Sequence, residues 1–138
     1  MAVSLALDIG KKRTGVAITD PFGCIAFGLE TVETDKLISY LQRLIEEKNI
    51  SYIVMGIPVG LRGEETDATQ WVKDLAEKIK ARFPTKKYAF VDERFTSKIA
   101  QQTLIQSGKN KKQRQNKPLT DKVSAVLILQ SWLESQPK

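Results

Sequence analysis

The stretch that most constrains the fold of this chain is Ser4–Thr19, with the sequence SLALDIGKKRTGVAIT. Its two apolar runs are typical of strands, and Gly10 and Gly15, which bound a short basic segment, predict a tight turn between them. Asp8 falls at the end of the first strand, where a carboxylate can be held rigidly toward a ligand. The pattern predicts a hairpin that presents one acid, which either binds a ligand or accepts hydrogen bonds from turn amides.

The rest of the chain alternates strands with helices. We expect strands at residues 25–32, 52–56 and 87–91, and helices at 35–48, from 66 or 67 to 83, 96–108 and from 120 to about 133. Thr34, Thr96 and Thr120 are the expected N-terminal residues of three of these helices. This order predicts one α/β domain over residues 1–138, in which an antiparallel meander and parallel strands form a mixed five-stranded sheet with helices on both faces.

The composition excludes several kinds of chemistry. The chain has no histidine, which excludes Ser-His-Asp triads and His-ligated zinc. Its one cysteine, Cys24, has no partner for a disulfide, and we expect a small buried side chain. Lys and Arg number 22 against 16 Asp and Glu, and the net charge of +6 favours a polyanionic partner. Because no apolar run approaches about 20 residues and no signal peptide is recognisable, we expect a cytoplasmic protein with no membrane contact.

Acids at the ends of three elements are predicted to meet in one crevice. Ligands collect at the carboxyl ends of neighbouring parallel strands. Asp8 ends the first strand, Asp92 and Glu93 end the fifth, and the loop 56–58 ends the strand expected between them. Asp121 lies in the first turn of the last helix, where the helix dipole alone also favours an acid. Successive strand residues face opposite ways, so unless the strand has already ended we expect only one of Asp92 and Glu93 to be a ligand. We favour Glu93, with Asp92 hydrogen-bonded to the turn.

Carboxylates without histidine are the donor set that Mg2+ or Mn2+ prefers. A cation would also offset the repulsion between crowded acids. One or two ions are expected, and two ions about 4 Å apart can activate a water and stabilise the leaving oxygen in phosphodiester hydrolysis.

Positive charge lies beside these acids in the sequence. Lys11, Lys12 and Arg13 follow Asp8, and residues 109–117, KNKKQRQNK, contain five cations and no acid. This segment is either a solvated loop or a phosphate-binding element, since it has no aromatic residue for stacking. The candidates for nucleic-acid binding are Lys11, Lys12, Arg13, Lys109, Lys111, Lys112, Arg114 and Lys117. Trp71 and Trp132 lie on apolar helical faces and are expected in the core.

Four segments together resemble the YqgF family of ribonuclease H-like proteins, which are described as Holliday junction resolvases and as nucleases that mature the small-subunit ribosomal RNA precursor. These segments are residues 8–17 (DIGKKRTGVA), 56–58 (GIP) with Gly63, 92–97 (DERFTS) and 121–130 (DKVSAVLILQ). The resemblance implies the ribonuclease H fold, a metal site at Asp8, Glu93 and Asp121, and Arg13 and Arg94 at that site. Related junction resolvases carry a further acid where this chain has Ser124, which leaves the number of ions open.

The leading hypothesis is a divalent-metal-dependent nuclease of structured RNA or branched DNA, which processes the ribosomal RNA precursor or resolves junctions. Cutting two symmetric strands of a junction would require a homodimer. The alternative is a non-catalytic nucleic-acid-binding module in ribosome assembly or transcription. Asp8-Ile9-Gly10 with Thr14 also resembles the first phosphate motif of actin-like ATPases, but those proteins need two such lobes and this chain has length for one.

Overall fold

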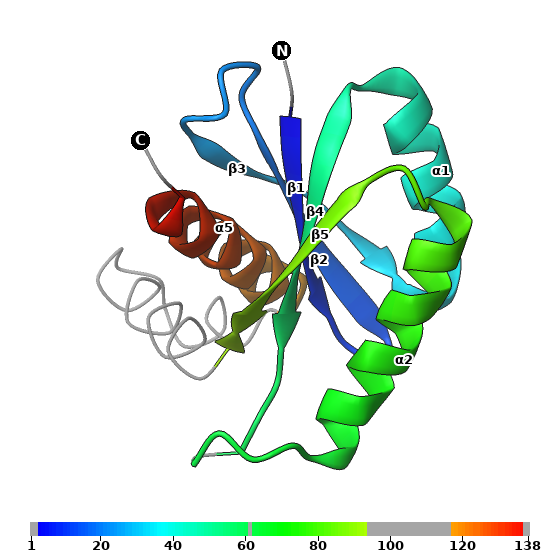
Figure 1. Cartoon of the computed structure of the whole chain (residues 1–138), viewed down its shortest axis with the longest axis vertical. Coiled ribbons are helices and arrows are strands. Elements are labelled where there is room, and N and C mark those ends of the chain that lie inside the picture. The colour runs from blue at the N-terminus through cyan, green and yellow to red at the C-terminus, as the bar shows by residue number, and fades with distance from the viewer. Residues whose placement is uncertain (1–2, 61, 94–116, 137–138) are drawn as a thin grey trace.

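The structure is a computed structural model that describes residues 3–60, 62–93 and 117–136, with the side chains of 117–121 excepted. Its elements follow the predicted alternation of strands and helices (Figure 1). They are β1 (Val3–Ile9), β2 (Arg13–Thr19), β3 (Ala26–Glu33), the 3-10 turn η1 (Thr34–Lys36), α1 (Leu37–Glu47), β4 (Ile50–Ile57), α2 (Asp67–Arg82), β5 (Lys87–Asp92) and α5 (Lys117–Ser135). The helix expected at residues 96–108 lies outside the described residues.

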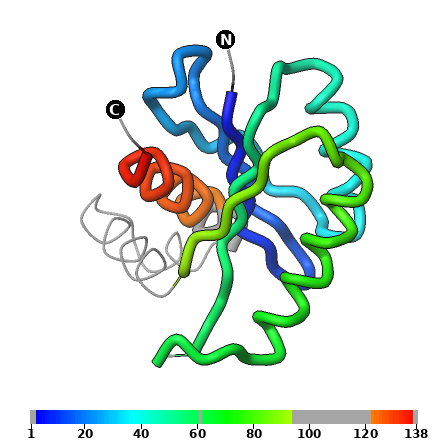
Figure 2. Tube along the Cα trace, viewed as in Figure 1, coloured from blue at the N-terminus to red at the C-terminus, as the bar shows by residue number. Residues whose placement is uncertain are grey.

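The five strands form one mixed sheet in the order β3-β2-β1-β4-β5. β1, β2 and β3 pair antiparallel as a meander, while β4 pairs parallel to both β1 and β5. The predicted sheet is therefore confirmed, and β4 lies between β1 and β5, as expected. Consequently the carboxyl ends of β1, β4 and β5 share one edge of the sheet (Figures 1 and 2).

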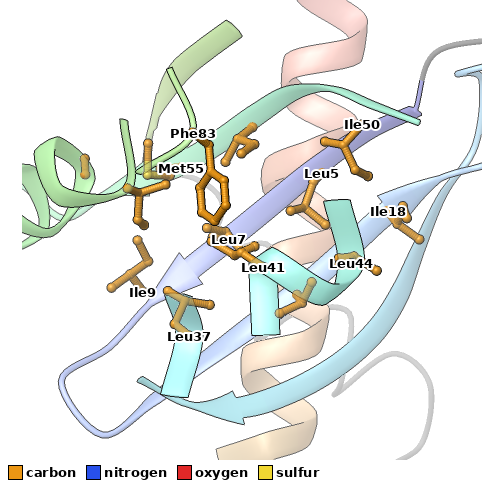
Figure 3. Close-up of a cluster of buried hydrophobic side chains, with 14 of the residues drawn as sticks. Leu5, Leu7, Ile9, Ile18, Leu37, Leu41, Leu44, Ile50, Met55 and Phe83 are labelled. Atoms are coloured by element: carbon orange, nitrogen blue, oxygen red, sulfur yellow. The ribbon is translucent and has the colours of Figure 1, made fainter. Parts of the chain in front are cut away.

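One face of the sheet is covered by α1 and α2 (Figure 1). Leu5 and Leu7 of β1 and Met55 of β4 are fully buried there against Leu41 of α1 and Phe83 at the end of α2 (Figure 3). Burying each such side chain contributes roughly 1.5–3 kcal/mol relative to its exposure. Because these residues occupy alternate strand positions, the intervening residues must face the opposite helix.

Among the described elements, α5 covers the other face (Figure 1). Small strand residues, Ala6 and Ala17 among them, let this helix approach the sheet closely through Ile128 and Leu129. Trp132 is 9% exposed and belongs to this cluster, and Trp71 of α2 is packed against the opposite core. The prediction that both tryptophans are core residues is confirmed.

Three local predictions were wrong. Thr34 does not cap α1: its hydroxyl turns away to bond the β1–β2 turn, and η1 precedes the helix. The last helix begins at Lys117 and not at Thr120, because Pro118 falls in the first turn, where its missing N–H needs no partner. Cys24 is exposed, because the side chain of Asp20 accepts from the backbone N–H groups of Cys24 (2.7 Å) and Ile25 (3.0 Å) and holds this segment in a surface turn.

Candidate active site

Asp8 has a glycine, which carries no side chain, as its neighbour on each adjacent strand. Along β1, Leu7 and Ile9 face α1 and α2, so the half-buried Asp8 faces α5 together with Ala6. On one side Asp8 pairs with Gly15 of β2. On the other, the parallel register that pairs Leu7 with Met55 places Asp8 beside Gly56 when it is continued by one residue. The Asp8 carboxylate is therefore flanked by two positions without side chains, Gly15 and Gly56, which we call the glycine floor.

Glu93, which comes directly after β5, lies over the same glycine floor. It follows Asp92, the last residue of β5, and its side chain packs directly over Gly56. A Cβ built on Gly56 would lie 2.4 Å from Glu93 Oε1 and 2.5 Å from Ile128 Cδ1 of α5, far inside normal contact. The absence of a side chain at Gly56 is thus what allows the Glu93 carboxylate to lie on the α5 face. The structure brings Asp8 and Glu93 to neighbouring positions on that face.

Asp92 points to the opposite face of the sheet. It lines a small pocket near Lys73 and Thr69 of α2, whereas Val91 faces the α5 core. Alternation along β5 thus separates the two adjacent acids, as the sequence predicted, and only Glu93 shares a face with Asp8.

Position 121 falls at the end of α5 nearest these acids. Ile128 lies over Gly56, and one turn later the ring of Trp132 lies 4.8 Å from that of Tyr52, near the start of β4. α5 therefore runs opposite to β4, and its N-terminal turns approach the carboxyl edge of the sheet. Position 121 lies two turns before Ile128, on the same helical face by spacing. Among the described side chains, which leave out that of 121, no three acids form a cluster that could hold a metal ion.

Hydrogen bonds from Thr34 hold the basic turn between β1 and β2 in place. The Thr34 hydroxyl donates to the carbonyl of Gly10 (2.6 Å) and accepts from the Thr14 hydroxyl (2.9 Å), and Thr34 N–H donates to the Lys12 carbonyl (2.9 Å). A Cβ at Gly10 would lie 2.8 Å from the Arg13 carbonyl oxygen, so this close turn requires glycine. Sequence reasoning missed the two threonine hydroxyls, because their partners are brought together only by the three-stranded meander.

The predicted cations of the β1–β2 turn lie at the surface. Lys11 and Lys12 are exposed and Arg13 is half-buried, and together they line an open groove with Glu33 and Asp35. Of the other predicted nucleic-acid-binding residues, Arg94, Lys109, Lys111, Lys112 and Arg114 lie outside the described residues, and Lys117 is placed only as the first residue of α5.

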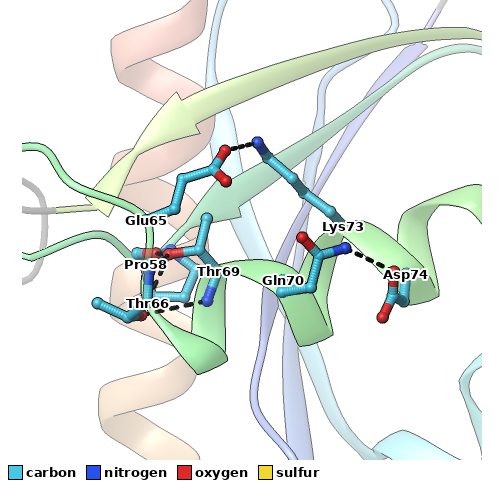
Figure 4. Close-up of polar contacts among 7 residues, drawn as sticks. All are labelled: Pro58, Glu65, Thr66, Thr69, Gln70, Lys73 and Asp74. Atoms are coloured by element: carbon cyan, nitrogen blue, oxygen red, sulfur yellow. Dashed lines mark hydrogen bonds and ion pairs between the residues drawn. The ribbon is translucent and has the colours of Figure 1, made fainter.

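The loop after β4 is tied to the start of α2 (Figure 4). The Thr66 side chain accepts from Thr69 N–H (3.3 Å), the Thr69 side chain accepts from Thr66 N–H (2.9 Å), and the Thr69 hydroxyl donates to the Pro58 carbonyl. Gly63, with φ of 83°, adopts the left-handed conformation of a tight turn. The predicted start of the second helix, at Thr66 or Asp67, is confirmed, with Thr66 as its N-cap.

The sheet order β3-β2-β1-β4-β5, with α1 and α2 on one face and α5 on the other, defines a ribonuclease H-like fold, and solved structures support it. The chain resembles the structure "T. thermophilus RuvC in complex with Holliday junction substrate", with a TM-score of 0.58 and 13% sequence identity, covering 93% of this chain and 92% of that one. A second structure, "Thermus thermophilus RuvC structure", matches with a TM-score of 0.56 and 12% identity over 96% of this chain and 97% of that one. At these identities the likeness shows the fold.

The family is shown by sequence. The chain matches, over residues 2–135, the model of the RuvX family, described as Holliday junction resolvase, and it belongs to that family. Proteins named "Putative pre-16S rRNA nuclease" are similar along almost their whole length: the one from Porphyromonas gingivalis is 41% identical over 131 residues, 95% of each chain. The one from Flavobacterium psychrophilum is 43% identical over 129 residues, 94% of each chain. The predicted family and fold are thereby confirmed. None of the helices in the described ranges is both long and apolar enough to cross a membrane.

Proposed function

We propose that this protein is a divalent-metal-dependent endonuclease that hydrolyses phosphodiester bonds of structured nucleic acid. The observation that carries the proposal is that Asp8 and Glu93 occupy neighbouring positions beside Gly56, at the carboxyl edge where α/β sheets bind ligands. Membership of the RuvX family, whose description is Holliday junction resolvase, supports the same chemistry.

The residues present fit Mg2+ or Mn2+. The donors at this edge are carboxylate oxygens, and the chain has no histidine to favour zinc. Asp8 and Glu93, with Asp121 from the start of α5, are the ligands we propose. A bound ion would supply Lewis-acid activation of a water and neutralise charge on the leaving oxygen. Ser124, buried one turn after position 121, supplies no carboxylate, which favours one firmly held ion over two.

The chain's own residues would bind and orient the substrate. Lys11 and Lys12 are exposed on the β1–β2 turn and can contact phosphates on either side of the cut bond. Arg13 and Arg94 follow Asp8 and Glu93 in the sequence, and we propose them, with Lys109, Lys111, Lys112, Arg114 and Lys117, as further phosphate contacts. The site would thus combine an acidic centre with a basic rim.

The substrate we propose is the precursor of 16S ribosomal RNA, because the curated relatives at about 40% identity carry that name. A four-way DNA junction is the second candidate, since the family description names it. In that case a homodimer would be needed to cut two symmetric strands. A ribosomal RNA precursor would be met in the cytoplasm, which is the location we propose.

Asp8→Asn tests the proposal most directly, because it keeps the shape of the side chain and removes its charge. We expect loss of at least about a hundredfold of Mg2+- or Mn2+-dependent cleavage, the scale of losing a group that acts in the transition state, with fold and nucleic-acid affinity retained. Precursor 16S RNA and a four-way junction are incubated side by side with wild type, Asp8→Asn and Asp74→Asn. Asp74 is an exposed acid of α2, which covers the face of the sheet opposite to that of Asp8, and serves as the matched control.

A non-catalytic binding module is the alternative function, and the same proteins distinguish it. If Asp8→Asn cleaves as fast as wild type, Asp8 is no metal ligand. If no protein cleaves with either metal, and calorimetric titration detects no Mn2+ uptake with or without nucleic acid, the binding module is the better account.

A further inference from the structure

The outer strand β3 carries most of the exposed apolar side chains. Among the described residues, four of the five large apolar side chains that are exposed lie in the β2–β3 turn and on β3: Phe22, Ile25, Phe27 and Leu29. Within the described sheet, β3 is the end strand and pairs only with β2 (Figure 1). The segment 25–29, IAFGL, contains no charged residue and no proline, although such residues normally protect an outer strand from pairing with another chain. This part of β3 is therefore suited to pair with a further strand.

The hydrogen bonds of Ile25 show which backbone groups of the segment face outward. Asp20 N–H donates to the Ile25 carbonyl (3.0 Å), and Ile25 N–H donates to the Asp20 side chain (3.0 Å), so both backbone groups of Ile25 point toward β2. The backbone groups of successive residues in a strand point to opposite edges. The N–H and C=O groups of Ala26 and Gly28 therefore point away from the sheet, where a further strand would meet them.

The exposed side chains of the segment share one face of the sheet. Ala26 belongs to the cluster under α5, and a Cβ at Gly28 would also face α5, so Phe27 lies on the opposite face. Ile25 and Leu29 are two positions to either side of Phe27 and lie on its face by alternation. Directly after Gly28 the register with β2 shifts by one residue, and because such a bulge bends a strand, it limits the regular edge to this short segment.

We propose that a second copy of this chain pairs its β3 antiparallel to this β3, about a two-fold axis at Phe27. In that register the outward groups of Ala26 in each copy exchange two hydrogen bonds with those of Gly28 in the other. Phe27 lies opposite Phe27 of the second copy, and Ile25 lies opposite Leu29. Every exposed apolar side chain of the segment thus meets another one. This self-complementarity favours a second copy over an unrelated strand.

The area of the patch predicts a reversible dimer. Phe22 is 71% and Phe27 51% exposed, so at about 150–250 Å² for a whole phenylalanine these two side chains expose about 180–300 Å² per copy. With Ile25, Leu29 and the strand edge added, two copies bury an area at or below the low end of stable interfaces, about 1,200 Å². We therefore expect a dissociation constant in the micromolar range.

The dimer would place both candidate active sites on one face of a continuous sheet. The two-fold axis is perpendicular to the sheet, so the α5 helices of both copies lie on the same side. From β1 of one copy to β1 of the other are five strand spacings, about 24 Å. Asp8 is level with Gly15, three residues along β2 from Ile18, the neighbour of Phe27, which adds about 20 Å along the strands and gives a separation of about 30 Å. The interface does not rest on the proposed function, but its consequence does: two sites on one face suit a substrate with two-fold symmetry, such as a four-way junction.

A charge swap at Phe27 tests both the interface and its register. Sedimentation velocity is recorded from about 1 to 200 µM, the range of a micromolar equilibrium, with a reducing agent so that the exposed Cys24 cannot cross-link two copies. Wild type should form a dimer as the concentration rises. Phe27→Lys and Phe27→Glu each place like charges directly opposite one another, and each should raise the dissociation constant at least about tenfold. An equimolar mixture of the two variants should form a dimer again, because opposite charges then face each other across the axis.

The control is Phe90→Ala, which removes an exposed apolar side chain from β5 and should leave the dissociation constant unchanged. Thermal unfolding shows whether each variant is folded, and Ile25→Lys, at an exposed position of the same segment, replaces any Phe27 variant that is not. A wild type that stays monomeric over the whole range overturns the inference and leaves this edge for a different partner. Equal dissociation constants of wild type and Phe27→Lys would place the interface elsewhere, and a mixture that stays monomeric would refute the register. Cleavage of the precursor RNA decides the proposed function separately in each case.

Discussion

Replacing Gly56 with alanine should disable the site while leaving the sheet intact. A Cβ at this position would lie 2.4 Å from Glu93 Oε1, 2.8 Å from Glu93 Cγ and 2.5 Å from Ile128 Cδ1. Ordinary contact begins near 3.4 Å, so the carboxylate must move by about 1 Å, the difference between 3.4 and 2.4 Å. Glu93 Cγ, near the root of its side chain, is also too close, and a rotation of the carboxylate alone does not relieve the clash.

Two free-energy terms set the expected stability. Overpacking in a filled core costs about 1–3 kcal/mol, and removing a glycine from the unfolded chain returns about 0.4–1 kcal/mol. We therefore expect Gly56→Ala to lower the free energy of unfolding by about 0–2.6 kcal/mol and to remain folded. Displacing a reacting group by 1 Å can cost about a hundredfold in rate, and cleavage should fall by that order.

Gly28→Ala is the matched control for this prediction. Gly28 also faces α5, but its Cβ would lie 3.6 Å from Val126 Cγ2 and 3.7 Å from the Lys122 side chain, which is normal contact. We expect unchanged cleavage and a stability equal to or slightly above wild type. Urea unfolding and metal-dependent cleavage are measured for wild type and both variants. If Gly56→Ala has the same stability and the same cleavage rate as Gly28→Ala, the position of Glu93 does not depend on the missing side chain at Gly56, and our description of the site is wrong.

Two further predictions concern the β1–β2 turn and the half-buried phenol of Tyr40. Thr34→Val leaves the Gly10 carbonyl and the Thr14 hydroxyl without their buried partner and should lower the free energy of unfolding in urea by about 1–3 kcal/mol. The control Ser39→Ala, on the exposed face of α1, should change this free energy little. Equal effects of the two variants would show that the Thr34 hydrogen bonds do not hold the β1–β2 turn. Burial, and after it the negative charge of Glu30, raises the pKa of Tyr40 from 10.0 to about 12. Between about pH 10 and 12 the unfolded chain therefore loses the Tyr40 proton while the folded chain keeps it, so the stability of the folded state falls as the pH rises through this window. Unfolding measured across this window should show the stability advantage of wild type over Tyr40→Phe shrinking, and a constant advantage would contradict it.

The sheet could be predicted from sequence because its information is local. The alternating apolar runs and the turn residues around Gly10 and Gly63 specify strands and connections without reference to distant parts of the chain. Strand bounds were right to within one or two residues, and the Thr66 cap was recognised because its partner lies three residues away. The environment of Thr34 could not be predicted because it is set by a contact with the distant β1–β2 turn. Cys24 was wrong for another reason: its surface turn is held locally by Asp20, and the prediction of a buried side chain rested on residue type alone.

The site was predicted only in part, for the same reason. Alternation along β5 separated Glu93 from Asp92, and the topology placed Asp8 on the same edge. Sequence could not show that Gly15 and Gly56 flank Asp8 on one face, because that follows from the registers of two strand pairs. The pocket that Asp92 lines could not be predicted because it is formed by the approach of α2 to β5. The metal-ligand role of the acids stays a prediction.

The acids on the glycine floor argue for catalysis over binding alone. A surface that only bound nucleic acid would gain affinity from its cations and lose it from every carboxylate near a phosphate. Asp8 and Glu93 nevertheless occupy neighbouring positions, and the intervening Gly56 removes the side chain that would keep them apart. Two such acids repel each other and the substrate unless a cation lies between them. If the two acids bind a metal ion, as we propose, Mn2+ should raise the thermal stability of wild type and not that of Asp8→Asn; equal shifts in a melting experiment would refute this reasoning.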